Sequence, residues 1–219
     1  MIVSSIDIGI QHLGLVKFSF TPGFKKKTLL DFDLVDIQEF HPFGDGDTCA
    51  LKHHDRCFSD WVAHVCQNFH KYFDDDVHQI LIERQPPQGL VVIEQLLMSR
   101  FRDRVTLIHP RSMHCYLGSN DADYEGRKRI VERRFLKFLR QCNPSMETKF
   151  DSLERRHDVA DAFCQLEFFA WTQRKRLAAR ALAADRERRR KELLSRPCKG
   201  KNLTLGQFFE QCKFRPTST

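Results

Sequence analysis

The amino-acid sequence predicts a mixed α/β domain with a basic helical C-terminal extension. An antiparallel meander of strands should come first and be followed by alternating strands and helices, with helices flanking the sheet. Three observations lead to this prediction. The first 37 residues hold three β-rich segments separated by turn residues. Apolar runs then alternate with apolar residues at helical spacing as far as about residue 171, and residues 173–194 contain neither Gly nor Pro.

The predicted meander occupies residues 2–10, 13–20 and 28–37. Its first strand is rich in Ile and Val, and Thr-Pro-Gly at residues 21–23 supplies a turn after the second strand. In the third segment Leu30, Phe32 and Leu34 alternate with acidic residues at close to the period of a strand. Consecutive strands joined by short turns are typical of antiparallel pairing.

Helical periodicity begins at about residue 54, where apolar residues recur at spacings of three and four up to residue 73. Residues 78–83 form a short apolar run, and Pro86 and Pro87 prevent this strand from continuing. The same criteria predict a strand at 105–110, buried or amphipathic helices at 90–101, 126–139 and 152–170, and a further helical stretch at 173–194. We therefore expect one domain over residues 1–171 and an extension over residues 172–219.

Charge and composition limit the classes of protein to which this chain can belong. There are 36 Lys and Arg against 29 Asp and Glu, and the basic residues gather at 127–140 and 174–201. Such patches attract polyanions, although each could also be the solvated face of a helix. No apolar run approaches the roughly 20 residues of a membrane span, no signal peptide is evident, and no phosphate-binding P-loop motif occurs. We expect an intracellular protein with reduced cysteines, no membrane association and no nucleotide cofactor.

Four acidic residues occupy positions of special interest. Asp7 lies inside the first strand, where alternation could turn it to solvent, and Glu83 ends a buried strand. Asp158 and Asp161 are one helical turn apart, so they repel one another unless a cation lies between them. Carboxylates on two strands and a late helix form a ligand set for hard divalent cations. Two such ions can activate a water molecule and stabilise the leaving oxygen of a phosphodiester.

Three motifs carry a family resemblance. The segments SIDIGI (5–10), ILIERQP (80–86) and RHDVADA (156–162) resemble the acidic motifs of the RNase H-like Holliday junction resolvases. They resemble in particular the RuvC-related branch with poxvirus and fungal mitochondrial enzymes. The resemblance covers residues 1–171. It implies a homodimeric crossover junction endodeoxyribonuclease that cuts four-way DNA symmetrically in replication or recombination.

By the same resemblance, the four acids bind Mg²⁺, with two ions per site for which Mn²⁺ can substitute. Lys128 best matches the family's basic residue before the last motif, although Arg127 or Arg129 could be the aligned position. The implied catalytic set is Asp7, Glu83, Lys128, Asp158 and Asp161. The expected DNA contacts are Arg84, Arg127, Lys128, Arg129, Arg133, Arg134 and Lys137. If the source is viral, the resemblance implies the cytoplasm or nucleus of an infected cell in preference to the mitochondrial matrix.

Two features fall outside the family pattern. Gln11 and His12 stand where relatives often have Lys-Asn, and the basic extension has no counterpart. The extension could track phosphates, or its apolar cluster at 203–209 could dock on the domain. Because fold and metal site do not fix the substrate, two other functions stay open. One is a different RNase H-like nuclease for flaps, RNA–DNA hybrids or transposon ends, and the other is a non-enzymatic DNA-binding protein.

Overall fold

The centre of the molecule is a five-stranded mixed sheet with strand order β3-β2-β1-β4-β5. The structure is a computed structural model and describes residues 1–9, 12–36 and 57–195. The strands are β1 (Ile2–Ile8), β2 (His12–Phe20), β3 (Lys27–Asp36), β4 (Val77–Glu83) and β5 (Val105–Ile108). The first three pair antiparallel, whereas β1, β4 and β5 run parallel. The predicted meander followed by strand–helix alternation is confirmed.

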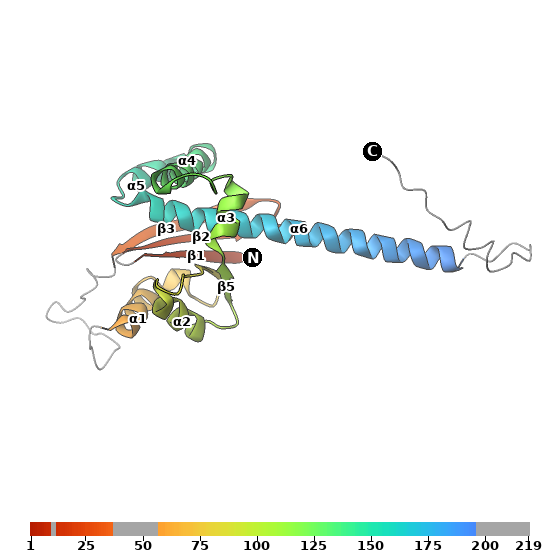
Figure 1. Cartoon of the computed structure of the whole chain (residues 1–219), viewed down its shortest axis with the longest axis horizontal. Helices are drawn as coiled ribbons and strands as arrows, with labels where there is room; N and C mark the ends of the chain where they lie inside the picture. The colour runs from red at the N-terminus through yellow and green to blue at the C-terminus, as the bar shows by residue number, and fades with distance from the viewer. Residues whose placement is uncertain (10–11, 37–56, 196–219) are drawn as a thin grey trace, which may run out of the picture. The chain divides into compact units, whose positions relative to one another are not determined.

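Helices cover both faces of the sheet. They are α1 (Phe58–Asn68), α2 (Val91–Arg100), α3 (Pro110–Leu117), α4 (Tyr124–Cys142), α5 (Glu147–Asp151) and α6 (Arg156–Ser195), with 3₁₀ turns η1 (Pro22–Phe24), η2 (His70–Tyr72) and η3 (Pro144–Met146). α1 and α2 lie on one side of the sheet, and α4, α5 and α6 lie on the other (Figure 1). The sheet is therefore the middle of three layers, and its central strands are covered on both faces.

The strands supply two separate cores because successive side chains point to opposite faces. On β1, Val3 packs into the core beneath α4, α5 and α6, whereas Ile6 and Ile8 pack into the core beneath α1 and α2. On β4, Leu81 belongs to the first of these cores and its neighbours belong to the second. This parity decides which face each polar residue of β1 and β4 must occupy.

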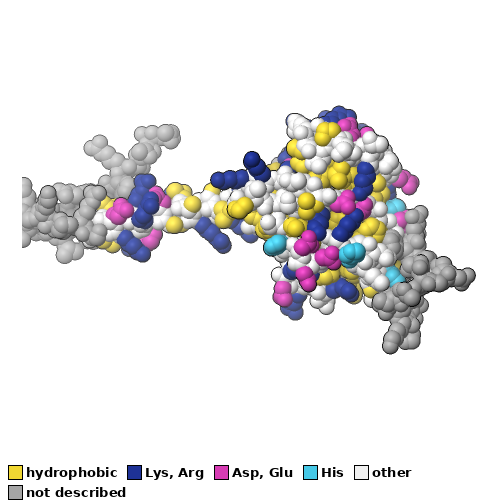
Figure 2. All heavy atoms as spheres, turned by 180° about the vertical axis from the view of Figure 1, so that it is seen from behind, with side chains coloured by type: hydrophobic (Ala, Val, Ile, Leu, Met, Phe, Trp, Pro, Cys, Tyr) yellow, Lys and Arg dark blue, Asp and Glu magenta, His cyan; other side chains and the backbone are white. Residues whose placement is uncertain are grey.

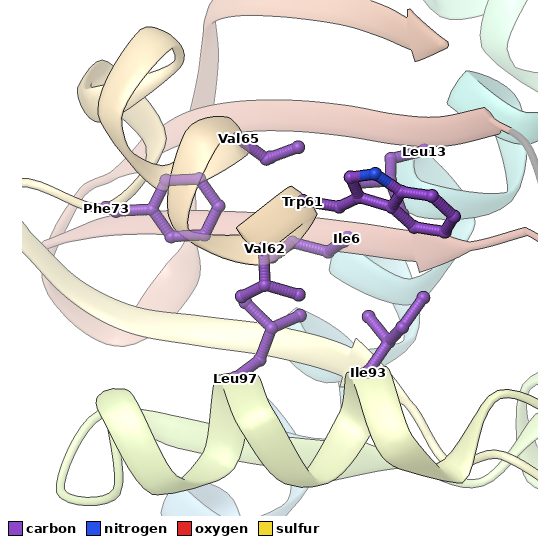
Figure 3. Close-up of a pocket in the computed structure, with 8 residues that line it drawn as sticks. All are labelled: Ile6, Leu13, Trp61, Val62, Val65, Phe73, Ile93 and Leu97. Atoms are coloured by element: carbon purple, nitrogen blue, oxygen red, sulfur yellow. The ribbon is translucent and has the colours of Figure 1, made fainter. Parts of the chain in front are cut away.

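The core beneath α1 and α2 is closed and apolar. Figure 3 shows Trp61, Val62 and Val65 of α1 and Ile93 and Leu97 of α2 on the same side of the sheet, packed over Ile6 and Leu13 of its strands. The space between these side chains is about 10 Å³, which is at the lower limit for one water molecule. This part of the molecule therefore stabilises the fold and offers no ligand cavity.

Helix ends follow local chemistry. The Asp123 side chain accepts a hydrogen bond of 2.7 Å from the backbone N–H of Gly126, which caps the start of α4. Pro110 is the first residue of α3, and Gly118 ends that helix with a left-handed φ of 69°. These caps fix α3 and α4 on the sheet side that carries α6.

Two details differ from the sequence prediction. No helix was expected at α3, since His109-Pro110 was assigned to the end of a strand, and no helix was expected at α5. The helical stretch expected at 173–194 continues the preceding helix, and together they form α6. No Gly or Pro interrupts that segment, so the change from buried to exposed side chains along it does not end the helix.

The chain divides into two compact units, residues 1–177 and 178–219. In the described part of the second unit, the side chains of α6 are exposed, apart from half-buried Asp185. The predicted apolar cluster at 203–209 lies outside the described residues. Among the described cysteines, Cys57, Cys66, Cys115, Cys142 and Cys164 are free thiols. No described helix has the length and apolar character needed to cross a membrane.

Surface charge is mixed on one face of the molecule. Figure 2 shows acidic and basic side chains interleaved over the compact unit on the face turned away in Figure 1. Some basic residues of this unit form ion pairs within the fold, because Lys71 and Lys149 both bind Asp31 and Asp33 of β3. The charges of these lysines are therefore partly neutralised by the protein itself.

Candidate active site

Asp7 and Glu83 meet at the carboxyl ends of two parallel strands. β1 and β4 are in register up to Ile6 opposite Ile82, so the next residues on the two strands are Asp7 and Glu83. Both share the parity of Val3 and Leu81, which places them on the α6 side of the sheet. Asp7 is only 9% exposed. The alternative in which alternation turns Asp7 to solvent is wrong, because helices cover both faces of β1.

A buried polar chain holds Asp7 in place. The Ser5 hydroxyl donates a hydrogen bond of 3.0 Å to Gln165 Oε1 of α6, and Gln165 Nε2 donates to Asp7 Oδ1 at 3.5 Å. Sequence analysis missed Gln165, because a glutamine in a helical run gives no signal of its own. Its burial between Ser5 and Asp7 makes it a positioning residue for the carboxylate.

The first two turns of α6 bring Asp158 and Asp161 to the same place. Asp158 is buried and Asp161 is half-buried. The helix can approach β2 closely because residue 14 is glycine: a Cβ there would lie 2.1 Å from the Asp158 carbonyl oxygen. Gly14 pairs with Asp7 across β1 and β2. The close contact between β2 and α6 therefore determines how near the α6 carboxylates come to Asp7.

The carboxylates of Asp7, Glu83, Asp158 and Asp161 form an acidic cluster in which like charges repel one another. Burial raises the pKa of Asp7 well above its usual range, and repulsion from Glu83 and Asp161 adds to this effect. Burial and repulsion from Glu83 and Asp158 raise the pKa of Asp161 to about 8. Without a cation, the cluster therefore retains protons near neutral pH.

Asp158 differs because two neighbouring side chains, Arg155 and His157, bind its carboxylate. Burial would raise its pKa, but hydrogen bonds from His157 and Arg155 outweigh burial and hold the pKa below its usual value. Arg155 Nε lies 2.9 Å from Asp158 Oδ2, and His157 Nε2 lies 3.0 Å from Oδ1. Asp158 is therefore the member of the cluster whose negative charge the protein already compensates.

Two basic residues of α4, Arg127 and Lys128, also line the cavity. Lys128 and Arg127 are half-buried and attract the carboxylate of Asp161, which partly offsets the rise of its pKa. Lys128 Nζ lies 4.1 Å from the centre of the Tyr124 ring and 4.0 Å from Glu125 Oε1. These contacts hold Lys128 at the rim of the site.

All five residues of the predicted catalytic set line one open cavity of about 940 Å³, together with Arg127. The lining also includes polar and aromatic residues that sequence analysis did not anticipate as site residues, among them His109, Arg111, His114, Asn120, Tyr124, Arg155 and His157. Two signals could have identified some of them. Arg155 and His157 flank Asp158 in the sequence, and His109 directly follows β5 at the edge of the sheet that also holds Glu83.

The other predicted DNA-binding residues lie outside the cavity lining. Arg84 follows β4 and is exposed, as are three residues of α4: Arg129, Arg133 and Lys137. Arg134 is half-buried, forms an ion pair with Glu167 and donates a hydrogen bond of 3.1 Å to the Tyr116 hydroxyl. The charge of Arg134 is therefore neutralised within the protein by Glu167.

The chemistry of the cavity suits a divalent cation. Among the residues that the structure describes, no three carboxylate, histidine or cysteine side chains are placed closely enough to hold a metal ion. The donors are nevertheless the carboxylate oxygens that Mg²⁺ and similar ions prefer. The raised pKa values of Asp7 and Asp161 arise from burial and mutual repulsion, and a bound cation would relieve the repulsion. The types of side chain in the cavity therefore fit a divalent cation, and the carboxylates would have to move closer together to bind one.

Replacing Asp161 with asparagine is expected to stabilise the metal-free protein. The pKa of this carboxyl is about 8 in the folded chain and about 4 when unfolded. The folded protein therefore holds an extra proton between these values, so the free energy of unfolding falls as the pH rises from about 4 to 8. In a chelator at pH 8, Asp161→Asn should melt roughly 3–10 °C higher than the unmodified protein.

The same substitution should also weaken the decline in melting temperature between pH 5.5 and pH 8. Asp75→Asn is the matched control, because this aspartate is fully exposed. It should leave both melting temperatures nearly unchanged. An Asp161→Asn protein that melted below the unmodified protein at pH 8 would contradict the repulsion described above.

The fold has counterparts among solved structures. The fold of this chain, a mixed sheet with a three-strand antiparallel meander, two further parallel strands and helices on both faces, matches that of a viral Holliday junction resolvase. Fowlpox virus resolvase in complex with its substrate Holliday junction DNA superposes with a TM-score of 0.59 at 15% identity. The match covers 78% of this chain and 98% of that chain.

The fowlpox virus Holliday junction resolvase alone gives a TM-score of 0.58 at 14% identity, covering 78% of this chain and 99% of that chain. Thermus thermophilus RuvC gives 0.45 at 18% identity, covering 78% and 96%. No family model matches the chain, and no curated protein sequence matches it. The predicted resemblance to RNase H-like resolvases is confirmed for the fold.

Proposed function

We propose that this chain is a metal-dependent, structure-selective DNA endonuclease that resolves four-way junctions. One observation carries the proposal: carboxylates from β1, β4 and α6 line a single open cavity that Lys128 and Arg127 of α4 also line. The shared fold with the fowlpox resolvase makes branched DNA the first substrate to test. The proposal assigns catalysis to residues 1–171 and an accessory role to residues 172–219.

Asp7, Glu83, Asp158 and Asp161 would hold Mg²⁺, in two ions per site, and Mn²⁺ would be accepted in its place. The bound metal would supply an activated water and stabilise charge on the leaving oxygen. The protein's own residues then have distinct tasks. Lys128 neutralises charge on the phosphodiester, Gln165 orients Asp7, and Arg155 with His157 orients Asp158. Water adds to phosphorus as the ester bond breaks, leaving one phosphate and one hydroxyl end.

Purified protein and end-labelled substrates of matched sequence test this proposal. A four-way junction, a flap, an RNA–DNA hybrid and a linear duplex are each incubated with Mg²⁺, with Mn²⁺ and with a chelator. Paired symmetric cuts in the junction that require metal support a resolvase. Preferred cutting of the flap or the hybrid would identify another nuclease of the same fold. If no substrate is cut, the proposal is wrong and a non-enzymatic DNA-binding protein is the remaining function.

We further propose that the active form is a homodimer. The described residues of each chain form an acidic cavity, whereas a four-way junction presents two symmetry-related strands, and isologous pairing would supply two equal sites. Apolar residues of α2 and of the position before it are candidates for the contact, because Val92 is 54% exposed and Leu90 and Leu96 are half-buried. Sedimentation equilibrium at assay concentrations gives the mass, and a single-chain mass with full paired cutting would exclude the dimer.

Deleting residues 178–219 is expected to weaken junction binding and flatten its salt dependence. The described part of this segment carries six basic residues (Arg180, Arg186, Arg188, Arg189, Arg190 and Lys191) and three acidic ones (Asp185, Glu187 and Glu192). Each phosphate that the shortened chain no longer neutralises should lower the slope of log K against log salt by about 0.9. Cleavage at saturating protein should persist, because the four acids lie in the retained unit.

Affinity for the junction is measured at several salt concentrations for both chains, together with melting temperatures. The shortened chain ends at Leu177, so it retains Trp171 and Lys175, which contact each other. An unchanged salt slope with a large fall in melting temperature would show that the segment stabilises the domain and does not bind phosphate.

A further inference from the structure

A second depression lies beside the acidic cavity, on the surface formed by α3 and α6. We call it the aromatic groove. It has a volume of about 750 Å³ and is lined by Arg111, Ser112, Cys115, Tyr116, Phe168 and Trp171. Arg111 also lines the acidic cavity, so this one side chain borders both depressions. All of these residues belong to the first compact unit.

Three rings form the floor of the groove. The ring centres of Tyr116 and Trp171 are 5.1 Å apart, those of Tyr116 and Phe168 are 5.8 Å apart, and those of Phe168 and Trp171 are 6.0 Å apart. Each ring is half-buried, so part of each ring is open to solvent. Rings that pack against one another are held rigid, and a partly exposed cluster of large aromatic residues marks a binding surface.

Positive charge borders these rings. Lys175 Nζ lies 4.1 Å from the Trp171 ring centre, and Arg111, which is exposed, lines both the groove and the acidic cavity. Glu167 adjoins Phe168 in the sequence, but Lys27 and Arg134 bind its carboxylate. Arg134 also donates a hydrogen bond to the Tyr116 hydroxyl, which fixes that ring. The lining itself contains no acidic side chain among the described residues.

This combination selects one chemical class of ligand. An apolar peptide would use the rings and leave the cations without partners, and a small anion would use the cations alone. A nucleotide uses both, because its base stacks on an aromatic face and its phosphate binds Lys or Arg. Only unpaired nucleotides expose a free base face, so duplex DNA fits the groove poorly.

We propose that the aromatic groove binds unpaired nucleotides of the DNA whose phosphodiester enters the acidic cavity. Bases stack on Trp171 and Tyr116, and Arg111 and Lys175 hold the adjoining backbone. This inference rests on the proposed function, because it makes the groove a continuation of the path of the substrate. It gives the enzyme a way to prefer a branch, where bases can be unpaired, over an uninterrupted duplex.

The test measures binding of single-stranded DNA without metal, using fluorescein-labelled oligothymidylate in a chelator. Trp171→Leu is expected to weaken binding by about 5- to 100-fold, the range found for removal of one stacked base, whereas Trp171→Phe should retain most of the affinity. Arg111→Gln, a change on an exposed side chain, should weaken binding and lower the salt slope by about one phosphate. Phe58→Leu is the matched control, because Phe58 is an exposed aromatic residue of α1.

A direct reporter is also available. The chain has two tryptophans, so Trp61→Phe leaves Trp171 as the sole one, and oligothymidylate should then quench its fluorescence in a saturable manner. Folded Trp171→Leu and Arg111→Gln proteins that both bind within twofold of the unmodified protein would overturn the proposal. The proposal would also be overturned if the unmodified protein were a dimer and Trp171→Leu had the mass of a single chain. The aromatic groove would then bind a second copy of the chain.

Failure of this proposal can be distinguished from failure of the proposed function. If the unmodified protein cuts the junction but the groove variants bind oligothymidylate normally, only the groove assignment is wrong. If the groove variants lose binding as expected but no substrate is cut with metal, the groove assignment stands and the nuclease assignment is wrong.

Discussion

Asp7→Asn is expected to lower metal-dependent cleavage of a four-way junction by about 1,000-fold or more while leaving junction binding within about threefold. Asp7 lies buried beside Glu83 at the centre of the acidic cluster. The substitution removes a ligand charge that would stabilise the transition state through the metal by several kcal/mol, and each 1.36 kcal/mol corresponds to a factor of ten. The basic surface that attracts phosphate is unchanged.

The substitution should not unfold the protein. Asparagine keeps the oxygen that accepts the hydrogen bond from Gln165 Nε2, and it removes a charge that burial and repulsion oppose. The melting temperature in a chelator should therefore be equal to or higher than that of the unmodified protein, which separates loss of chemistry from loss of fold. Asp103→Asn, at an exposed aspartate, should leave both cleavage and melting unchanged. Cleavage by Asp7→Asn within tenfold of normal would remove Asp7 from the proposed metal site.

The sheet was predictable because its signals are local. The alternation of Leu30, Phe32 and Leu34 and the turn at 21–23 define the meander. Pro86 and Pro87 prevent β4 from extending far beyond Glu83. The positions of Asp7 and Glu83 at the carboxyl edge follow from parallel pairing of β1 and β4. The sequence does not show which helices cover each face of the sheet. The side on which Asp7 and Glu83 lie could therefore not be predicted from it.

The residues that were missed depend on tertiary contacts. The α3 helix is short and begins at a proline that also suits the end of a strand, so its residues Arg111 and Tyr116 were not placed. Arg134 looked like a free cation of a basic helix, yet Glu167 on α6 binds it. Arg155 and His157 flank an acid that sequence analysis identified, but only the folded chain shows that they bind it. Charge compensation of this kind cannot be derived from spacing along one helix.

Gly14→Ala is expected to reduce cleavage by about 100-fold or more without changing any charged group. A Cβ at this position would lie 2.1 Å from the carbonyl oxygen of Asp158, 2.4 Å from its carbonyl carbon and 2.8 Å from the nitrogen of Val159. All three are backbone atoms of α6, so no side-chain rotation can relieve the overlap. The start of α6 must move away from β2 and carry Asp158 and Asp161 with it. A displacement of about 1 Å at reacting groups can reduce the rate by roughly 100-fold.

The same overlap should destabilise the fold. Overpacking of a tight contact costs about 1–3 kcal/mol, which corresponds to a fall in melting temperature of roughly 2–12 °C for a chain of this size. Cleavage is therefore measured well below the melting temperature, with far-ultraviolet circular dichroism confirming that the variant is folded. Gly23→Ala is the matched control: Gly23 has a φ of 75° and no atom within 3.9 Å of an added Cβ, so alanine there introduces backbone strain without moving α6.

The two glycine variants separate stability from geometry. Gly23→Ala should lose a comparable part of its melting temperature and retain normal cleavage when folded. Gly14→Ala should retain junction binding, because the basic residues of α4 are untouched, and should lose the chemical step. If folded Gly14→Ala cut within tenfold of normal, the contact between β2 and α6 would not determine the placement of the α6 carboxylates. Asp158 and Asp161 would then have to reach Asp7 and Glu83 by side-chain movement alone.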